Sequence, residues 1–250
     1  MFGEIIVGVN FGRGGDAAVA LARRLVSEDG RLTLTNIVPS DPTVFRGQRD
    51  DIVASEWALS LSLLERERHL VQLDVPGDRP PRIETSALVA ASTGRGLHVV
   101  AERRGADLIV VGSAKHGGLG AVLFGDDTRS VVRGAPCAVA VAPRGWAGEQ
   151  PLRRIGAGGD PRAVAVARAL ATRHDLEVLA AGGDPARLSR QVDLLVVGPG
   201  RARGWRRPRR PAARSSSERL ARVSACPLVV LAPPPGTRPS GGSPPTSCAP

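Results

Sequence analysis

The stretch DLIVVGSAKHGGLGAVLFGDDTRSVVRGAPCAVAVAP, residues 107–143, decides the fold of this chain. An apolar run, Leu108–Val111, ends in Gly112, and a glycine loop with a helix-compatible segment separates it from a second apolar run, Ala138–Ala142. This order of strand, glycine loop, helix start and strand lets backbone N–H groups face a phosphate. The stretch therefore predicts the frame of an anion site inside an α/β domain.

The same alternation extends back to the N-terminus. Apolar runs predict strands at 4–9, 31–38, 82–89, 107–111 and 137–142, and helices are expected at 16–26, 51–71, 96–104 and 127–133. The first helix places Ala18, Leu21, Ala22 and Leu25 on one stripe. Strands that are apolar throughout and joined by helices indicate a parallel sheet covered on both faces. With right-handed crossovers, residues 1–143 then form a doubly wound α/β domain.

The chain repeats this pattern in a shortened form. The run DLIVVG at 107–112 returns as DLLVVG at 193–198, and the strand at 4–9 returns at 154–158. Gly8 and Gly112 are 104 residues apart, whereas Gly156 and Gly198 are only 42 residues apart. The sequence thus predicts a second, truncated copy of the same α/β domain.

These observations divide the chain into four parts. The full domain spans 1–143, a linker spans 144–153, the truncated copy spans 154–232, and a tail rich in Pro, Gly and Ser spans 233–250. The truncated copy retains strands at 154–158, 176–181, 193–197 and 227–231 and helices from Pro161, from Pro185 and at 217–223. The strand at 176–181 corresponds to either the second or the third strand of the first copy, although the GDPA that follows it resembles the segment after the third.

The amino-acid composition limits the kinds of protein that this chain is expected to be. Apolar residues make up 42% of the 250 residues, which supports a packed core, and no apolar run is long enough for a membrane span. The start MFGEIIVGVN has no basic segment, so we expect no signal peptide. Three cysteines without metal-ligand spacing favour a reducing, cytoplasmic location.

The net charge of +10 comes largely from one segment of the chain. Seven arginines lie within 201–214, and without them the net charge would be +3. Lys115 is the only lysine, so the basicity is almost wholly arginine. Because only Trp205 is present for base stacking, this arginine run does not by itself predict a nucleic-acid site.

The spacing of the glycine loop resembles the universal stress protein family. Its signature is a glycine, two residues, a glycine, nine residues, then glycine and serine or threonine. Gly112 and Gly125 fall on this spacing, whereas Lys115 stands at the second glycine and Asp126 at the serine or threonine. The resemblance implies the adenine nucleotide alpha hydrolase-like fold with strand order 3-2-1-4-5. It also implies a stress-response role without catalysis, and a pseudo-dimer of the two copies through the strands at 137–142 and 227–231.

The resemblance also implies a nucleotide site for ATP. The base and ribose would lie at the ends of the first two strands, and the phosphates on the glycine loop and the helix after it. The corresponding residues of this chain are Asn10, Val38, Gly112, Ser113, Lys115, Gly125, Asp126 and Thr128. Asn10 stands where the family usually has aspartate. In the second copy an insertion and the arginine run replace the body of the loop, although Ser215 and Ser217 remain at the start of its expected helix.

Lys115 and Asp126 depart from the family signature, and each has two alternative roles at this site. Lys115 either reaches a phosphate as a point charge or blocks the approach of a ligand. Asp126 either caps the helix with its own carboxylate and repels phosphate, or holds a Mg²⁺ ion that the phosphates share. The protein is accordingly expected to be either a nucleotide-binding regulator or a nucleotide-free adaptor that acts through protein contacts. Nucleic-acid binding through 201–214 is the third and weakest class.

Overall fold

The structure is a computed structural model. It describes residues 2–11, 13–40, 46–73, 81–113, 122, 125–149, 151–158, 160–181, 185–198 and 224–233. Lys115, the arginine run 201–214, the expected helix at 217–223 and the tail from 234 lie outside these residues.

The N-terminal half alternates strands and helices, as the apolar runs predict. Its elements are β1 (Phe2–Gly8), α1 (Arg13–Leu25), β2 (Val26–Pro39), α2 (Arg46–Leu73), β3 (Arg82–Ala90), α3 (Thr93–Arg104), β4 (Leu108–Gly112), α4 (Asp126–Val132) and β5 (Ala138–Ala142). The C-terminal half contains β6 (Arg154–Gly158), α5 (Pro161–His174), β7 (Glu177–Ala181), α6 (Pro185–Leu188), β8 (Leu194–Val197) and β9 (Leu228–Val230).

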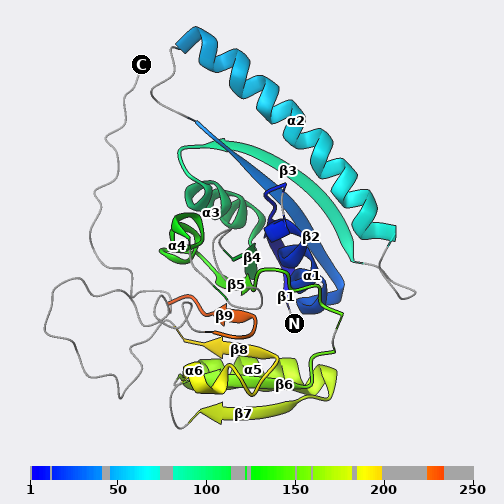
Figure 1. The fold of residues 1–250 in the computed structure, drawn as a ribbon, viewed down its shortest axis with the longest axis vertical. Coiled ribbons are helices and arrows are strands. Elements are labelled where there is room, and N and C mark those ends of the chain that lie inside the picture. Colours follow the sequence, from blue (N-terminus) through cyan, green and yellow to red (C-terminus); the bar gives the residue numbers. More distant parts are fainter. Residues whose placement is uncertain are drawn as a thin grey trace, which may run out of the picture.

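All these strands belong to one sheet of nine strands in the order β3-β2-β1-β4-β5-β9-β8-β6-β7 (Figure 1). Pairing is parallel within each half and antiparallel only where β5 meets β9, with Ala140 opposite Val229. The mostly parallel α/β architecture is therefore confirmed. The last strands of the two halves, which the sequence predicts to lie against each other, are hydrogen-bonded neighbours.

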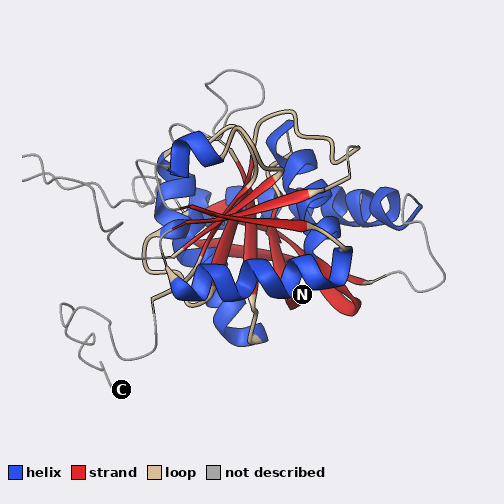
Figure 2. Ribbon diagram, turned by 90° about the horizontal axis from the view of Figure 1, so that it is seen from below, coloured by secondary structure: helices blue, strands red, loops and turns tan. Residues whose placement is uncertain are grey.

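Helices cover both faces of the sheet (Figure 2). One apolar cluster packs α1, α2 and α5 on one face, and a second packs α3, α4 and α6 on the other. Each cluster runs across the junction: Leu21 and Leu170 belong to the first, and Leu97 and Leu188 to the second. The predicted stripe of α1 is confirmed, since its four members are at most 1% exposed. The two halves therefore share a continuous core on either face.

Several boundaries and correspondences differ from the sequence-based expectation. β2 begins at Val26, directly after α1, because Phe2 of β1 already pairs with Val26. β7 lies next to β6, which is the place of the second strand and not the third. The registers of β1 with β4 and of β6 with β8 match Gly8 with Gly158, not with Gly156 as the sequence comparison suggests.

One backbone contact recurs in both halves. The carboxylate of Asp107 accepts hydrogen bonds from the N–H groups of Gly3 and Glu4, at 2.9 and 3.1 Å, where the chain enters β1. Asp193 accepts the same two bonds from Arg153 and Arg154, both at 2.8 Å, where the chain enters β6. The aspartate that opens each DL(I/L)VVG run thus ties the start of the strand that follows it, β4 or β8, to the start of the first strand of its half, β1 or β6.

Candidate functional site

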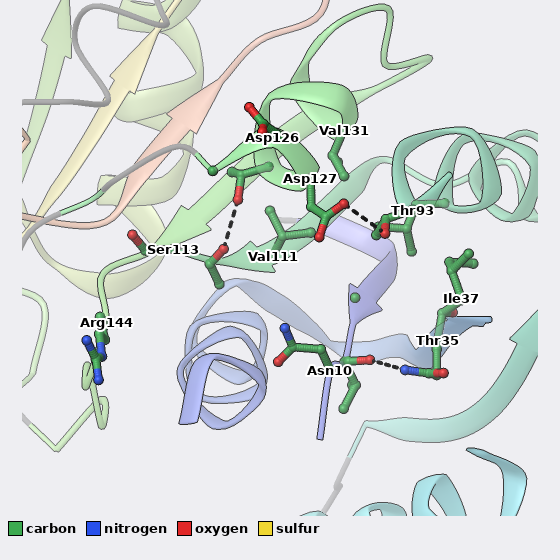
Figure 3. A pocket seen from close by; sticks show the side chains of 17 residues that line it. Asn10, Thr35, Ile37, Thr93, Val111, Ser113, Asp126, Asp127, Val131 and Arg144 are labelled. Atoms are coloured by element: carbon green, nitrogen blue, oxygen red, sulfur yellow. Dashed lines mark hydrogen bonds between the residues drawn. The ribbon is translucent and has the colours of Figure 1, made fainter. Parts of the chain in front are cut away.

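The candidate site is a cavity of about 580 Å³ at the carboxyl ends of the strands of the N-terminal half (Figure 3). Its described lining comes from β1, β2, α3, β4, α4 and the segment after β5. The lining residues are Gly8, Val9, Asn10, Thr35, Asn36, Ile37, Thr93, Leu97, Val111, Gly112, Ser113, Gly125, Asp126, Asp127, Thr128, Val131 and Arg144. This size is typical of small-molecule sites.

The strand order explains why a cavity forms here. β1 lies between β2 and β4, and the chain crosses from β1 to β2 on one side but reaches β4 and β5 on the other. The helices that follow β1 and β4 therefore diverge to opposite faces of the sheet and leave a crevice between the two strand ends. Such a switch point is the usual ligand site of open α/β sheets.

The structure brings most of the predicted residues together. Six of them line the cavity, namely Asn10, Gly112, Ser113, Gly125, Asp126 and Thr128. Val38 does not line this cavity: it lies in β2 opposite Val89 of β3 and is buried. Thr35, Asn36 and Ile37 line the cavity from β2 instead. Lys115 is outside the described residues.

Two predicted polar residues already hold the frame of the site. The N–H of Ser113 donates to the carbonyl of Ala142 at 2.9 Å, so this N–H faces β5 and not a ligand. The hydroxyl of Thr128 donates to the carbonyl of Gly112 at 3.3 Å (Figure 3). Both residues are buried. Thr128 therefore links the end of β4 to α4, and the wall between Gly112 and α4 is fixed before any ligand binds.

The start of α4 corrects the interpretation of Asp126 as a helix cap. Gly125 is the N-cap residue and makes no side-chain cap, whereas Asp126 is the first residue of the helix. The Asp126 side chain is fully exposed, and its carboxylate lies 3.4 Å from Arg129, one turn further along. Gly125 has φ −71° and ψ 177°, an extended conformation open to any residue. Its lack of a side chain, and not a positive φ, is what it contributes to the wall.

Helix α3 holds α4 in place beside the cavity. Thr93 donates to Asp127 at 3.2 Å, and a ring nitrogen of His98 lies 2.7 Å from the carbonyl of Val131 near the other end of α4. Gly94 allows the close approach, since a Cβ there would lie 2.5 Å from the backbone of Ser130. The orientation of the seven-residue α4 is thus set by contacts with α3 at both of its ends.

Asn36 is a lining residue that the sequence reasoning missed. Its side-chain amide donates to the carbonyl of Val9 at 2.7 Å, and its oxygen accepts from Ser60 of α2 at 2.9 Å. Asn36 therefore joins β2, the end of β1 and α2 at the edge of the cavity. The available signal was an amide residue inside the apolar run LTLTNIV of the second strand, since a polar side chain there needs partners.

A second missed contact joins the site to the C-terminal half. Val122 is fully buried, and its N–H donates to the carbonyl of Ser224 at 3.0 Å, just before β9. Only two residues separate Val122 from Gly125, so the chain spans at most about 11 Å between them. The chain that leads into α4 is therefore hydrogen-bonded at Val122 to the C-terminal half.

The described charges of the cavity are two carboxylates, Asp126 and Asp127, and one guanidinium, Arg144. The described residues contain no group of three or more His, Cys, Asp or Glu side chains that would hold a metal ion by themselves. Mg²⁺ commonly binds one or two carboxylates together with phosphates of the ligand. Two aspartates are enough for this mode of Mg²⁺ binding, but not for a site made wholly of protein ligands.

The corresponding place in the C-terminal half is filled by the protein itself. Asp160 caps α5 by accepting from the N–H of Arg162 at 2.9 Å, and its carboxylate lies against Gly198 so closely that a Cβ on Gly198 would collide with it. Arg162 also donates to the carbonyl of Ala232 at 3.2 Å, beyond β9. Within the part of the chain that the structure describes, these contacts occupy the space between the ends of β6 and β8.

The described cysteines lie away from the cavity lining and are not in disulfides. Burial raises the pKa of both Cys137 and Cys226 to about 12, so each thiol stays protonated at neutral pH. A protonated thiol is a poor nucleophile and a poor metal ligand. None of the described helices has the length and apolar character that spanning a membrane requires.

Comparison with known proteins gives a family match for the N-terminal half and structural matches across most of the chain. The model of the universal stress protein family matches residues 1–143. A universal stress protein from Archaeoglobus fulgidus DSM 4304 is structurally similar, with a TM-score of 0.66 and 11% identity over 92% of this chain and 98% of that one. A putative universal stress protein from Pseudomonas aeruginosa UCBPP-PA14 has a TM-score of 0.59 and 14% identity over 92% of this chain and 93% of that one. At these identities the likeness concerns the fold alone. No curated protein sequence matches the chain.

Proposed function

The chain belongs to the universal stress protein family, and from this membership we propose that it is a regulatory stress-response protein. In this proposal it binds ATP or a related nucleotide, with Mg²⁺, in the cavity of its N-terminal half and does not turn the nucleotide over. The observation that carries the proposal is the position of the cavity at the switch point between β1 and β4, where Gly8, Gly112 and Gly125 leave its wall free of side chains.

The charges around the cavity favour a nucleotide that carries a cation. Asp126 is fully exposed and lies beside Arg129, so water and the guanidinium both weaken its repulsion of a phosphate. We expect that repulsion to change affinity by less than about tenfold. With Mg²⁺ bound to the phosphates, Asp126 and Asp127 become favourable neighbours instead.

The lining supports binding better than catalysis. Its described side chains include no histidine, cysteine or lysine. The hydroxyl of Thr128 donates a hydrogen bond to the carbonyl of Gly112, and the carboxylate of Asp127 accepts one from the hydroxyl of Thr93. Thr93 and Asp127 form a hydroxyl–carboxylate pair in the lining, but this hydrogen bond joins α3 to α4, so we assign it to holding the wall of the cavity and not to activating a nucleophile. The proposal therefore assigns these residues to holding a ligand.

In the same proposal the C-terminal half is a shortened second copy that forms a pseudo-dimer with the first. The repeated contacts of Asp107 and Asp193 support this, as does the antiparallel pairing of β5 with β9. Asp160 and Arg162 occupy the described part of its crevice, so we assign the nucleotide to the N-terminal half. We also place the protein in the cytoplasm, in keeping with its free Cys137 and Cys226.

The test is a calorimetric titration of the full chain with ATP, with and without Mg²⁺. We expect one nucleotide per chain and tighter binding with Mg²⁺. Substitution of both cavity carboxylates, Asp126→Ser with Asp127→Ser, should weaken binding of Mg-ATP and leave metal-free ATP unchanged or tighter. Asp51→Ser is the matched control, because Asp51 is an exposed aspartate of α2 away from the cavity.

Two outcomes would contradict the proposal. Absence of binding in both titrations would favour a nucleotide-free adaptor that acts through protein contacts. Hydrolysis of ATP by the purified chain, lost in the double variant, would show that the protein is an enzyme. The substitution Lys115→Gly tests the glycine loop separately: tighter binding would mean that the lysine blocks the ligand, and weaker binding that it contacts a phosphate.

A further inference from the structure

Helix α2 carries a second, outward-facing row of side chains besides the one that packs on the sheet. The packed row includes Leu64 and Val71, which are buried, and Trp57, whose indole N–H donates to the carbonyl of Ala87 in β3 at 3.0 Å. The second row consists of Glu56, Leu59, Leu63, Arg66 and Leu70, which we call the α2 seam. Its members are alternately three and four residues apart, the spacing of a coiled-coil seam.

The α2 seam lies at the surface although it is rich in leucine: Leu63 is half-buried, and the other four members are exposed. Leu59 is 60% exposed and Leu70 is 52% exposed, the two highest values among the exposed large apolar residues that the structure describes. Glu56 and Arg66 are exposed as well, and neither forms an ion pair with any described residue. By contrast Glu65, on another flank of the helix, pairs with Arg68 and accepts from Thr85. Leu59 and Leu63 with one hydrated charge on either side form an apolar centre with a polar rim, which is typical of an interface.

The order of residues in the seam is self-complementary. Glu56 and Arg66 each lie five residues from position 61, and Leu59 and Leu63 each lie two residues from it. If two copies of α2 pack antiparallel about position 61, each Glu56 faces the Arg66 of the other copy, and each Leu59 faces the other Leu63. A parallel pair would place Glu56 against Glu56 and Arg66 against Arg66. The charges therefore select the antiparallel arrangement.

The position of α2 leaves room for a second molecule. The helix runs along the outside of β2 and β3, at one end of the sheet, with no described element beyond it (Figure 1). The apolar strand β5, which would be an exposed edge in the N-terminal half alone, is already covered by β9 of the same chain. Self-association of this chain therefore requires a surface other than β5.

We propose that the α2 seam is a dimer interface at which a second copy of this chain packs its own α2 antiparallel, with two Glu56–Arg66 pairs flanking a core of Leu59 and Leu63. The contact is isologous, so it closes after two molecules. It does not depend on nucleotide binding.

Sedimentation velocity of the full chain tests this interface. We expect a reversible monomer–dimer equilibrium that weakens as salt is raised, because the pairs at its rim are screened. Glu56→Arg and Arg66→Glu should each weaken the dimer by at least about tenfold, because each places two pairs of like charges in contact. A mixture of the two variants should form a heterodimer as stable as the wild-type dimer, since positions 56 and 66 then carry opposite charges at both ends of the seam.

The control is Asp51→Arg, a change of an exposed acid to arginine on the same helix but outside the seam, and it should leave the dimer unchanged. Circular dichroism of every variant should match the wild type, which shows that α2 is intact. A wild-type chain that remains monomeric up to about 0.5 mM, where even a Kd of about 0.1 mM would give a substantial dimer population, would overturn the proposal. So would a dimer that both variants retain, or two monomeric variants that do not associate when mixed.

Discussion

At the scale of single residues, Gly125 and Asp126 determine where α4 begins beside the cavity and which charge lies at its first turn. The sequence places an acid where the family has a hydroxyl residue, and an aspartate before an apolar run is an ordinary sign of a helix cap. In the structure the helix begins one residue earlier than expected, so Gly125 takes the cap position and Asp126 points to solvent beside Arg129. Asp126 therefore adds a negative charge beside the cavity, but its side chain does not occupy the cavity.

This geometry predicts opposite effects of serine at two glycines. Gly125→Ser should stabilise the protein by about 0.5–1 kcal/mol, because the extended φ and ψ of Gly125 suit a serine N-cap and the unfolded chain loses freedom. Gly105→Ser should destabilise it by about 1 kcal/mol, because Gly105 ends α3 with φ +62°. Urea unfolding measures both, and a larger loss at 125 than at 105 would show that the helix starts elsewhere.

The buried thiols predict how stability depends on pH. The folded-state pKa of Cys226 is raised to about 12 by burial, from an ordinary value of 9.0. Between these values the unfolded thiol ionises while the folded one keeps its proton, so the free energy of unfolding falls as pH rises, by about 1 kcal/mol per pH unit for this residue. Cys226→Ala should be less stable than wild type at pH 8, and its stability should decline less steeply above pH 9. Parallel curves for the two proteins would contradict the burial of this thiol.

At the scale of elements, the contact between α3 and α4 sets the width of the cavity. Gly94 brings α3 against the backbone of Ser130, and Thr93 reaches Asp127 from the next position. No periodicity in the sequence reveals this contact, because it joins residues 34 to 36 positions apart through their backbone shapes. The strands, in contrast, follow from the apolar runs, since parallel strands buried on both faces are mostly apolar.

The same contrast explains which parts of the site the sequence predicted. Gly112, Gly125 and Thr128 belong to the loop and helix next to β4, so their local pattern already places them together. Asn36 lines the cavity only because β2 pairs with β1 in one particular register and α2 packs above it. Val38 lies just beyond the lining for the same reason, since the cavity borders Thr35, Asn36 and Ile37 of β2.

Gly94→Ala tests the α3–α4 contact. The added Cβ would meet the Ser130 backbone at 2.5 Å, so α4 must shift, and we expect a loss of about 1–2 kcal/mol in stability and weaker binding of nucleotide. Gly3→Ala is the control, because its Cβ would lie at an ordinary 3.4 Å from Asp107. Thermal unfolding and titration with Mg-ATP give the two readouts. Retention of full affinity in Gly94→Ala would mean that α4 takes no part in the site.

At the scale of the whole molecule, the C-terminal half packs on the N-terminal one through a shared sheet and shared core. The two halves share one sheet and both apolar clusters, and the N–H of Val122 is held by Ser224 close to β9. Asp160 lies against Gly198 at the ends of β6 and β8, whereas the ends of β1 and β4 border the open cavity. A ligand of the first crevice should therefore also stabilise the segment around Ser224, because both restrain the start of α4.

Hydrogen exchange of the full chain with and without saturating Mg-ATP tests the central claim most directly. We predict slower exchange at Asn10, at the start of α4 (126–129) and at 224–226, with no change at 160–162 or 198. Slower exchange confined to 160–162 and 198 would place the nucleotide in the wrong half, and slower exchange confined to 201–214 would indicate charge-driven binding to the arginine run. Either result, or no change anywhere in the chain, would contradict a nucleotide site between β1 and β4.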